Sequence, residues 1–248
     1  MELKSFVIEL TGDGSPTLRL KNANNQFPEK MPESMHHSGG AAAETLYIYA
    51  GPFKNTLSTL NALNKKELSV GVVGLGLGYI ELAALQSLTA NSSISATITS
   101  FEKETELTES FKAWAAGSEN KTYDLICEKL NVDKAKSLAL LQTLNWNALG
   151  ELTVQTQIEK KFNFVAYDAF SQFTDGPLWA DDFLDFFLKN LCATDCVFAT
   201  YGCTGLLKRA LIRNNFIFIK RLGFRGKRDA TLALRGEFTS HQHLFQSV

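Results

Sequence analysis

The sequence predicts an α/β protein with a Rossmann-like, doubly wound and mostly parallel sheet, preceded by a small N-terminal β extension. Beyond position 68, short apolar runs typical of buried strands alternate with helix-like segments of about ten to fifteen residues. This order produces βαβ units, in which helices cover both faces of a parallel sheet. A glycine-rich turn after one strand and a carboxylate after a later one place polar groups at strand ends, where such folds bind ligands.

Composition sets limits on the class of protein. The chain has 248 residues, of which 45% are hydrophobic and 21% charged, with a formal net charge of -1. These values suit a folded domain with a real core and exclude both a globally basic nucleic-acid coat protein and an acidic disordered chain. The longest uncharged stretch, residues 82–101, is too polar to cross a membrane. The first residues lack the apolar segment of a secretory signal, so we expect a cytoplasmic protein.

Cysteine and histidine do not indicate a metal site. The four cysteines are Cys127, Cys192, Cys196 and Cys203. Without an export signal they are expected to be reduced thiols. The pair Cys192 and Cys196 has no second Cys or His pair to complete a tetrahedral zinc site. We therefore expect buried structural cysteines and no bound metal.

The amino-terminal part differs from the rest in its pattern. Residues 5–20 alternate around a Gly12-Asp13-Gly14-Ser15 turn, which predicts a β hairpin. Residues 22–40 are rich in Asn, Pro, Ser and Gly, which predicts an ordered loop or flap. We therefore expect a hairpin and flap over residues 1–40, followed by one large domain over residues 41–248.

The larger part contains the alternating elements. Its predicted strands cover residues 70–73, 96–101, 162–167, 196–200, 216–220 and 231–234. Its predicted helices cover residues 43–63, with an interruption near Gly51-Pro52, and residues 79–88, 105–116, 127–149, 177–191 and 205–214. A short basic loop joins the last two strands, which predicts that they are antiparallel.

The glycine turn is the first candidate binding site. Gly74, Gly76 and Gly78 follow a strand and open a helix. Glycine permits positive φ and lets a ligand lie against the backbone. The nicotinamide and flavin fingerprint requires a third glycine at position 79, which is Tyr79 here. The observed G-x-G-x-G spacing is usual in S-adenosylmethionine (SAM) sites, although a tight turn without a ligand would also fit.

A carboxylate follows the second strand of the alternating region. Glu102 lies 24 residues past Gly78, where doubly wound folds place an acidic residue for a ribose. Glu104 is a poorer candidate for the same role. The alternative is a solvated acidic start of the next helix, since Glu is favourable near a helix N-terminus.

Asp168 is the candidate catalytic residue. It directly follows the predicted strand 162–167, so its side chain is expected beside the glycine turn and facing the group to be transferred. The alternative is a loop or helix cap. Phe170 and Trp179 lie in the same loop and could stack on a base or on adenine, or belong to the core.

Several segments together resemble a known enzyme family. The segments are Glu44-Thr45-Leu46-Tyr47, Ser100-Phe101-Glu102-Lys103, Asp168-Ala169-Phe170, Pro177-Leu178-Trp179, Phe198-Ala199-Thr200-Tyr201, Leu207-Lys208-Arg209-Ala210-Leu211 and Gly223-Phe224-Arg225-Gly226-Lys227-Arg228. In this order they resemble the methyltransferase half of MnmC, the bifunctional enzyme of 5-methylaminomethyl-2-thiouridine synthesis in tRNA. The resemblance runs from about residue 34 to residue 236. The chain departs from the family pattern at Val72, in residues 152–157, which lack the family's Gly-Asp pair near adenine, and in the loop of residues 171–177.

The resemblance implies a function and its residues. It implies a SAM-dependent N-methyltransferase that methylates the 5-aminomethyl group of the wobble (2-thio)uridine in tRNA. Asp168 would lie at the reacting amine, and the basic loop would reach the anticodon arm. The chain has no room for the family's FAD-dependent oxidase half, which implies a stand-alone transferase. The residues implied to hold the cofactor are Gly74, Gly76, Gly78, Glu102, Glu44, Tyr47, Asp168 and Phe170.

Three other functions remain open at this point. The chain could methylate a small amine or another RNA position, or it could be a non-catalytic module that binds tRNA or a nucleotide. A nicotinamide oxidoreductase is disfavoured by Tyr79. Binding of SAM, S-adenosylhomocysteine and NADH separates these alternatives. The oligomeric state does not follow from the sequence.

Basic residues are concentrated near the carboxyl end. Residues 200–236 contain nine Lys and Arg against Asp229 alone, whereas the rest of the chain is acidic. Such a polarised charge is typical of a phosphate-binding surface, although a solvated helix face would look similar. Phe224 could stack on an unpaired base or pack under the loop. The candidate RNA-binding residues are Lys208, Arg209, Arg225, Lys227 and Arg228.

Overall fold

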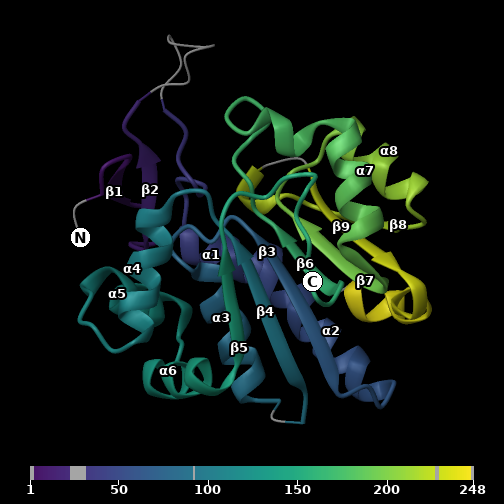
Figure 1. Ribbon diagram of the computed structural model, residues 1–248, viewed down its shortest axis with the longest axis horizontal. Helices are drawn as coiled ribbons and strands as arrows, with labels where there is room; N and C mark the ends of the chain where they lie inside the picture. The colour runs from purple at the N-terminus through teal and green to yellow at the C-terminus, as the bar shows by residue number, and fades with distance from the viewer. Residues whose placement is uncertain (1–2, 23–31, 92, 227–228, 247–248) are drawn as a thin grey trace.

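The protein is built on a seven-stranded sheet in the order β5-β4-β3-β6-β7-β9-β8 (Figure 1). The structure is a computed structural model that describes residues 3–22, 32–91, 93–226 and 229–246. The strands of this sheet are β3 (Glu67–Val73), β4 (Ser95–Phe101), β5 (Asn145–Leu149), β6 (Phe162–Tyr167), β7 (Cys192–Thr200), β8 (Ile217–Arg221) and β9 (Ala230–Arg235).

The pairing of the strands confirms the predicted fold class. Strands β5, β4, β3, β6 and β7 are parallel neighbours, and only β9 runs antiparallel, between β7 and β8. The predicted antiparallel pairing of the last two strands is therefore confirmed. The chain leaves β3 in one direction toward β4 and β5, and later returns beside β3 as β6. The sheet thus has its topological switch point between β3 and β6.

Helices cover both faces of this sheet. They are α1 (Ala41–Thr45), the π-helix η1 (Leu46–Ala50), α2 (Gly51–Ala62), α3 (Tyr79–Thr89), α4 (Thr105–Ala115), α5 (Lys121–Leu130), α6 (Lys134–Thr143), α7 (Asp181–Asn190) and α8 (Gly205–Arg213). Three 3-10 segments complete the chain: η2 (Gly176–Trp179), η3 (Phe224–Gly226) and η4 (Gly236–Phe245).

Side-chain alternation along the strands separates two large apolar clusters. Val70 and Val72 of β3 pack with residues of α2 and α3 on one face. Val73 and the residues Phe162 and Val165 of β6 pack with α7 and α8 on the other face. Strands buried on both faces explain the near-continuous apolar runs in the sequence.

The N-terminal hairpin is confirmed. Strands β1 (Phe6–Leu10) and β2 (Pro16–Leu20) pair antiparallel around the predicted turn. Leu3, Phe6 and Leu18 belong to a third apolar cluster with residues of α3, α4 and α5. The hairpin therefore packs against the end of the main sheet where α4 and α5 lie (Figure 1). Part of the predicted flap, residues 23–31, falls outside the described residues.

The predicted helix over residues 127–149 is wrong in its last part. Helix α5 ends at Leu130, and its C-cap Asn131 has a left-handed φ of 54°. A new helix, α6, begins at the side-chain cap of Asp133. Residues Asn145–Leu149 then form the edge strand β5 beside β4. The polar and apolar residues of Asn145-Trp146-Asn147 alternate with the period of a strand, a signal too short to outweigh the helical residues before it.

Two other predicted helices are divided. The segment predicted over residues 43–63 is one helical path whose middle turn, Leu46–Ala50, is a π-helix next to Gly51 and Pro52. The predicted interruption at that place is therefore confirmed. The segment over residues 177–191 begins as the 3-10 turn η2, and α7 starts only at Asp181.

Candidate active site

The candidate site lies at the switch point of the sheet. Val73 at the end of β3 pairs with Tyr167 at the end of β6, so Gly74 and Asp168 are the next residues of two adjacent strands. The amide of Asp168 donates to the carbonyl of Val73 at 2.8 Å. A cavity of about 580 Å³ opens at these strand ends. Its volume suits a cofactor-sized ligand.

The glycine turn forms one wall of this cavity. Gly74, Gly76 and Gly78 have φ values of 89°, 52° and 70°, which L-residues with a Cβ rarely adopt. A Cβ at Gly76 would lie 3.1 Å from the sulfur of Met35. Gly78 directly precedes α3, and a Cβ at this position would overlap the Phe111 ring. Gly74 and Gly76 line the cavity, so a ligand there meets bare backbone.

Glu102 lies directly against this turn. One of its carboxylate oxygens accepts from the amide of Gly76 and the other from the amide of Glu104, both at 3.0 Å. The side chain is 9% exposed, and burial raises the pKa of Glu102 while these two backbone hydrogen bonds oppose the shift. Each oxygen retains a lone pair, so the carboxylate can still accept from ribose hydroxyls.

The wall beyond Glu102 contains several apolar side chains. Leu152 and Val154 line it from the loop after β5, and Phe170 lines it from the loop after β6. Lys103 forms an ion pair with Asp175, and both residues line the cavity. An apolar surface beside a ribose-binding carboxylate fits an adenosyl group. These residues and the glycine turn therefore suit SAM.

Asp168 also lines this cavity, at the end of β6. The hydroxyl of Tyr49 donates to Oδ1 of Asp168 at 2.5 Å. Tyr201 lines the cavity nearby, and its hydroxyl donates to the carbonyl of Ala169 at 2.9 Å. Burial, followed by the charge of Asp168, raises the pKa of Tyr49 and of Tyr201 well above the ordinary value. Both phenols are therefore neutral donors at physiological pH.

A strap of residues 33–37 covers this end. Glu33 accepts from the amide of Ser171 at 3.0 Å and from the hydroxyls of Ser171 and Thr174. His36 Nδ1 lies 2.9 Å from Oγ1 of Thr17 in the hairpin. The strap thus bridges the N-terminal hairpin and the loop after β6.

Glu44 of α1 connects the strap to the site. It is buried and lines the cavity, and its carboxylate accepts from the amide of His37 at 2.6 Å. With Asp168 and Glu33, it makes this end of the cavity acidic. A cationic or hydrogen-donating group suits such a lining better than a phosphate does.

The structure brings most of the predicted site residues together. Those that line the cavity are Gly74, Gly76, Glu102, Glu44, Asp168 and Phe170. Gly78 and Tyr47 are not among the described residues of the lining. Tyr47 instead donates its hydroxyl to the carbonyl of Leu222 at 3.0 Å. Trp179 is 4% exposed within the core and donates to the carbonyl of Phe170, so it belongs to the core rather than to a stacking surface.

Sequence reasoning missed Tyr49, Tyr201 and Glu33. Tyr49 is 119 residues from Asp168 in the chain, and no local spacing connects the two. Tyr201 follows β7 directly, so its position at a strand end was the available signal. Glu33 lies in a segment without periodicity, where only the folded strap reveals its contact with Ser171.

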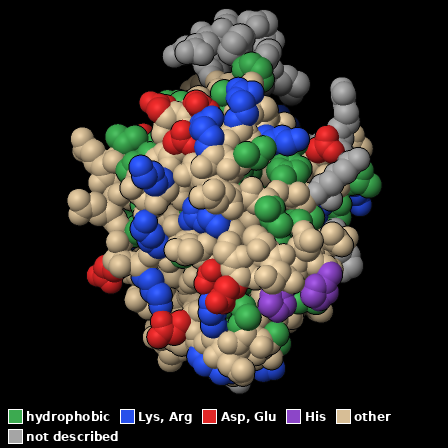
Figure 2. Space-filling view, turned by 90° about the vertical axis from the view of Figure 1, so that its right-hand side faces the viewer, with side chains coloured by type: hydrophobic (Ala, Val, Ile, Leu, Met, Phe, Trp, Pro, Cys, Tyr) green, Lys and Arg blue, Asp and Glu red, His purple; other side chains and the backbone are tan. Residues whose placement is uncertain are grey.

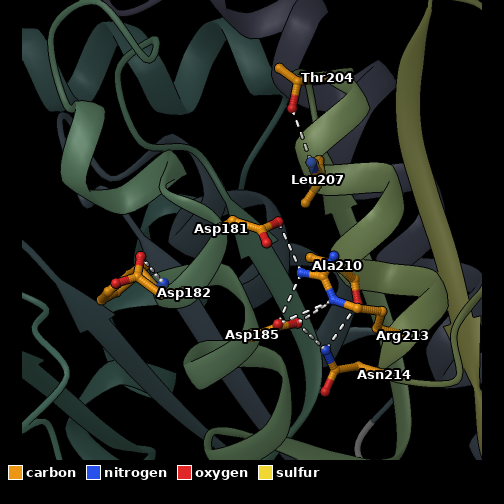
Figure 3. A network of polar contacts seen from close by, with 9 residues as sticks. Asp181, Asp182, Asp185, Thr204, Leu207, Ala210, Arg213 and Asn214 are labelled. Carbon is orange, nitrogen blue, oxygen red and sulfur yellow. Dashed lines mark hydrogen bonds and ion pairs between the residues drawn. The ribbon is translucent and has the colours of Figure 1, made fainter.

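The basic residues of the carboxyl-terminal region divide into two groups. Arg221 and Arg235 point inward, where they donate to backbone carbonyls. Arg213 is held by Asp181 and Asp185 at 2.9 Å, as Figure 3 shows. These three arginines are occupied within the protein, so the count of basic residues along the sequence overstates the charge available to a ligand.

Three other basic side chains of this region are exposed. Lys208 and Arg209 are exposed on α8, and Arg225 is exposed beside the strap, where it donates to the carbonyl of Gly39 at 2.6 Å. Lys227 and Arg228 fall outside the described residues. Figure 2 shows Lys and Arg side chains spread over the side of the molecule that carries α8, with apolar and acidic side chains between them. Phe224 is 8% exposed and packs under the loop.

Membrane-spanning helices and metal clusters are both absent from the described parts of the chain. There, no helix is long and apolar enough to cross a membrane. No group of three or more His, Cys, Asp or Glu in these parts is arranged to hold a metal ion. Cys127, Cys192 and Cys196 are buried free thiols, and Cys203 is an exposed one.

Comparison with known proteins adds a family to this geometry. Residues 123–236, which include β6, Asp168 and α8, match the family of S-adenosyl-L-methionine-dependent methyltransferases. The matched part of the chain is that of a SAM-dependent methyltransferase. The donor expected from the glycine turn and Glu102 is therefore the donor of the family. None of the curated proteins matches the methyltransferase over its sequence.

One solved structure supports the same fold over nearly the whole chain. The methyltransferase is similar to MnmC2 from Aquifex aeolicus, with 22% identity and a TM-score of 0.65 over 98% of this chain and 77% of that one. The predicted Rossmann-like fold is thereby confirmed, and the resemblance to MnmC-type enzymes extends to the whole fold. Ribosomal protein L11 methylase from Lactobacillus delbrueckii subsp. bulgaricus is more distant, with 16% identity, a TM-score of 0.39 and coverage of 74% and 77%. NodS from Bradyrhizobium japonicum, in complex with S-adenosyl-l-homocysteine, has 10% identity, a TM-score of 0.40 and coverage of 80% and 94%.

Proposed function

We propose that this methyltransferase methylates the nitrogen of a 5-aminomethyl group on the wobble uridine or 2-thiouridine of a tRNA. The observation that carries the proposal is the position of Asp168, whose carboxylate lies in the same cavity as the glycine turn and Glu102. The resemblance of the carboxyl-terminal segments to MnmC-type enzymes supports this acceptor.

The lining of the acceptor end favours an amine. Asp168, Glu44 and Glu33 are all carboxylates of this lining. An alkyl ammonium has a reference pKa of about 10.4, so the acceptor arrives mainly as a cation. Carboxylates attract such a cation and repel phosphate, which leaves the tRNA backbone to contacts outside the cavity.

The chemistry left to the protein is positioning and proton transfer. When bound, SAM supplies a methyl group that is already electrophilic on its sulfonium. The amine must lose a proton before its lone pair can attack. Asp168 accepts a hydrogen bond from the amine, orients it and takes up that proton at a carboxylate oxygen, directly or through water. The apolar walls and the strap exclude bulk water from this end.

The exposed basic side chains serve the tRNA backbone in this proposal. Lys208 and Arg209 lie on α8, which begins shortly after Tyr201 of the cavity lining. Arg225 lies beside the strap. Lys and Arg neutralise phosphates without reading base sequence, so these residues orient the anticodon arm while the cavity selects the amine.

The experiment is methylation of tRNA from cells that lack this gene. Purified protein and SAM are added to this tRNA, and nucleosides are measured by mass spectrometry. We expect the unmethylated aminomethyl uridine to disappear and its N-methyl form to appear in equal amount. We expect Asp168→Asn to lose this activity while its SAM affinity, measured by calorimetry, stays within about twofold of wild type.

Three outcomes would contradict the proposal in different ways. Methylation of another nucleoside would move the acceptor within RNA. Methylation of small amines but not of tRNA would exclude tRNA as the substrate. Failure to bind SAM would indicate a non-catalytic module.

A further inference from the structure

The π-helix η1 forms because its neighbours cannot complete an α-helix. The amide of Gly51 donates to the carbonyl of Leu46, five residues earlier, rather than to that of Tyr47. Pro52 has no amide hydrogen, so it cannot donate to Tyr47 or Ile48 either. The carbonyl of Tyr47 thereby has no donor four or five residues later in the chain, and that of Ile48 has none four residues later. π-turns of this kind are frequent at functional sites because the extra residue redirects the side chains.

Arg221 supplies the missing donors from the end of β8. Its guanidinium donates to the carbonyl of Ile48 at 3.0 Å and to that of Tyr47. The same group lies over the Tyr47 ring, 4.3 Å from its centroid. The residue is 5% exposed and burial lowers the pKa of Arg221, while these carbonyls and this ring stabilise the buried cation.

The braced turn determines where Tyr49 points. Tyr49 is 3% exposed and lies between the braced residue Ile48 and the start of α2. Its hydroxyl reaches across to Oδ1 of Asp168 at 2.5 Å. In an uninterrupted α-helix the side chains before Gly51 would be rotated relative to α2. The π-turn therefore links the contacts of Arg221 with Tyr47 and Ile48 to the contact of Tyr49 with Asp168.

We infer that Tyr49 is a positioning residue for Asp168, and that Arg221 maintains it in place by bracing η1. The inference rests on the proposed role of Asp168. A donor to one carboxylate oxygen fixes the rotamer and favours the ionised form. The other lone pairs of the carboxylate then have a defined direction toward the cavity. Arg221, which the sequence places in the basic region, acts in this way inside the protein rather than on tRNA.

The first test removes only the phenolic oxygen. We expect Tyr49→Phe to reduce kcat by about ten- to hundredfold, with SAM affinity within about twofold of wild type. We also expect the acidic limb of the pH profile of kcat to move to higher pH, because the carboxylate has lost a donor. In the double variant with Asp168→Asn, kcat should be no lower than in Asp168→Asn alone, because the two residues act as a unit.

Tyr167→Phe is the matched control. Tyr167 is also buried, and its hydroxyl donates to the carbonyl of Leu178 at 2.5 Å. Both tyrosine variants should therefore lose similar thermal stability. Only Tyr49→Phe should move the pH profile. If kcat falls by a similar factor in both variants and the pH profile of kcat moves in neither, Tyr49 has only a structural role and the inference is overturned.

The second test changes Arg221, whose guanidinium donates to the carbonyls of η1. Arg221→Met removes both donors, and Arg221→Lys retains a single donor group. We expect the kcat of Arg221→Lys to lie between that of wild type and that of Arg221→Met. If Arg221→Met does not fold, the role of Arg221 is tested by comparing Arg221→Lys with wild type. A wild-type pH profile in a folded Arg221 variant would remove Arg221 from the inference.

A readout without substrate separates this inference from the proposed function. In protein labelled with ¹³C at Asp carboxyl groups, Asp168→Asn identifies the Asp168 signal. That signal should titrate at a higher pH in Tyr49→Phe than in wild type. If wild type does not methylate tRNA but this shift appears, the proposed function fails and the coupling stands. If wild type methylates tRNA and Tyr49→Phe matches it in kcat and titration, the inference fails alone.

Discussion

Gly74 and Asp168 approach each other so closely that no side chain fits between them. A Cβ at Gly74 would lie 2.7 Å from the carbonyl oxygen of Asp168. The two residues follow paired strands, β3 and β6, and Gly74 has a φ of 89°. The glycine therefore does more than expose backbone to SAM. It also permits the strand end that carries Asp168 to lie beside the donor-binding turn.

Gly74→Ala should damage both functions of this glycine. The left-handed backbone costs an L-residue about 1–2 kcal/mol, and the clash with Asp168 adds to it. We expect a lower thermal midpoint, weaker SAM binding and loss of methyl transfer, measured by thermal unfolding, calorimetry and a methylation assay.

Gly117→Ala separates backbone strain from the clash. Gly117 has a φ of 100°, but a Cβ there would meet no atom within 4 Å. We expect it to lose stability through strain alone and to bind SAM normally. Equal loss of SAM binding in both variants would contradict the role given to the close approach of Gly74 and Asp168.

Glu102 should account for much of the donor affinity. Charge-assisted hydrogen bonds are worth about 1.5–3 kcal/mol, so Glu102→Gln should weaken SAM binding by about ten- to hundredfold. Calorimetry measures this directly. Glu104→Gln changes the neighbouring carboxylate, whose amide rather than side chain contacts Glu102. The Glu104→Gln variant should bind SAM as wild type does. If Glu104→Gln weakens SAM binding and Glu102→Gln does not, then Glu104 rather than Glu102 holds the ribose.

Glu81 should make stability depend on pH. It is fully buried on α3, accepts from the Ser100 hydroxyl at 2.6 Å, and burial raises the pKa of Glu81 to about 8. Between its ordinary pKa of 4.5 and this value, the folded protein retains a proton that the unfolded chain has released. Stability therefore falls as pH rises through this window, by up to about 1.4 kcal/mol per pH unit from this group.

Glu81→Gln should remove this dependence, because the amide is neutral at every pH. We expect the variant to gain stability relative to wild type as pH increases from about 5.5 to about 7.5, as measured by urea unfolding. Glu109→Gln, at an exposed position on α4, should follow the wild-type curve. A difference between Glu81→Gln and wild type that stays constant with pH would show that Glu81 is ionised when folded.

The exposed basic residues of α8 should contribute to tRNA binding through phosphates. We expect Lys208→Ala with Arg209→Ala to weaken binding and to reduce the slope of log K against log salt by about 0.7–0.9 for each phosphate that is no longer neutralised. SAM affinity should not change. The matched pair Lys112→Ala and Lys121→Ala removes two exposed charges near α4 and α5, on the opposite side of the sheet from α8 (Figure 1). Equal effects of both pairs would indicate only general charge attraction.

Short-range pattern was enough to predict most of the fold. The runs before Gly74 and Asp168 are long and apolar because β3 and β6 are buried on both faces, and that pattern does not depend on distant residues. The edge strand β5 was missed because it lacks such an apolar run. Its outer side is exposed, it is five residues long, and helical segments precede it.

The sequence by itself determined the sheet, the glycine turn and the strand-end residues Glu102 and Asp168, because each depends on a few neighbouring residues and on the rule that ligands bind at strand ends. Only the tertiary structure decided which other side chains join them. Tyr49 reaches Asp168, Glu33 reaches Ser171, and Arg221 turns inward to η1. Such contacts depend on packing between segments far apart in the chain, and no local spacing encodes them.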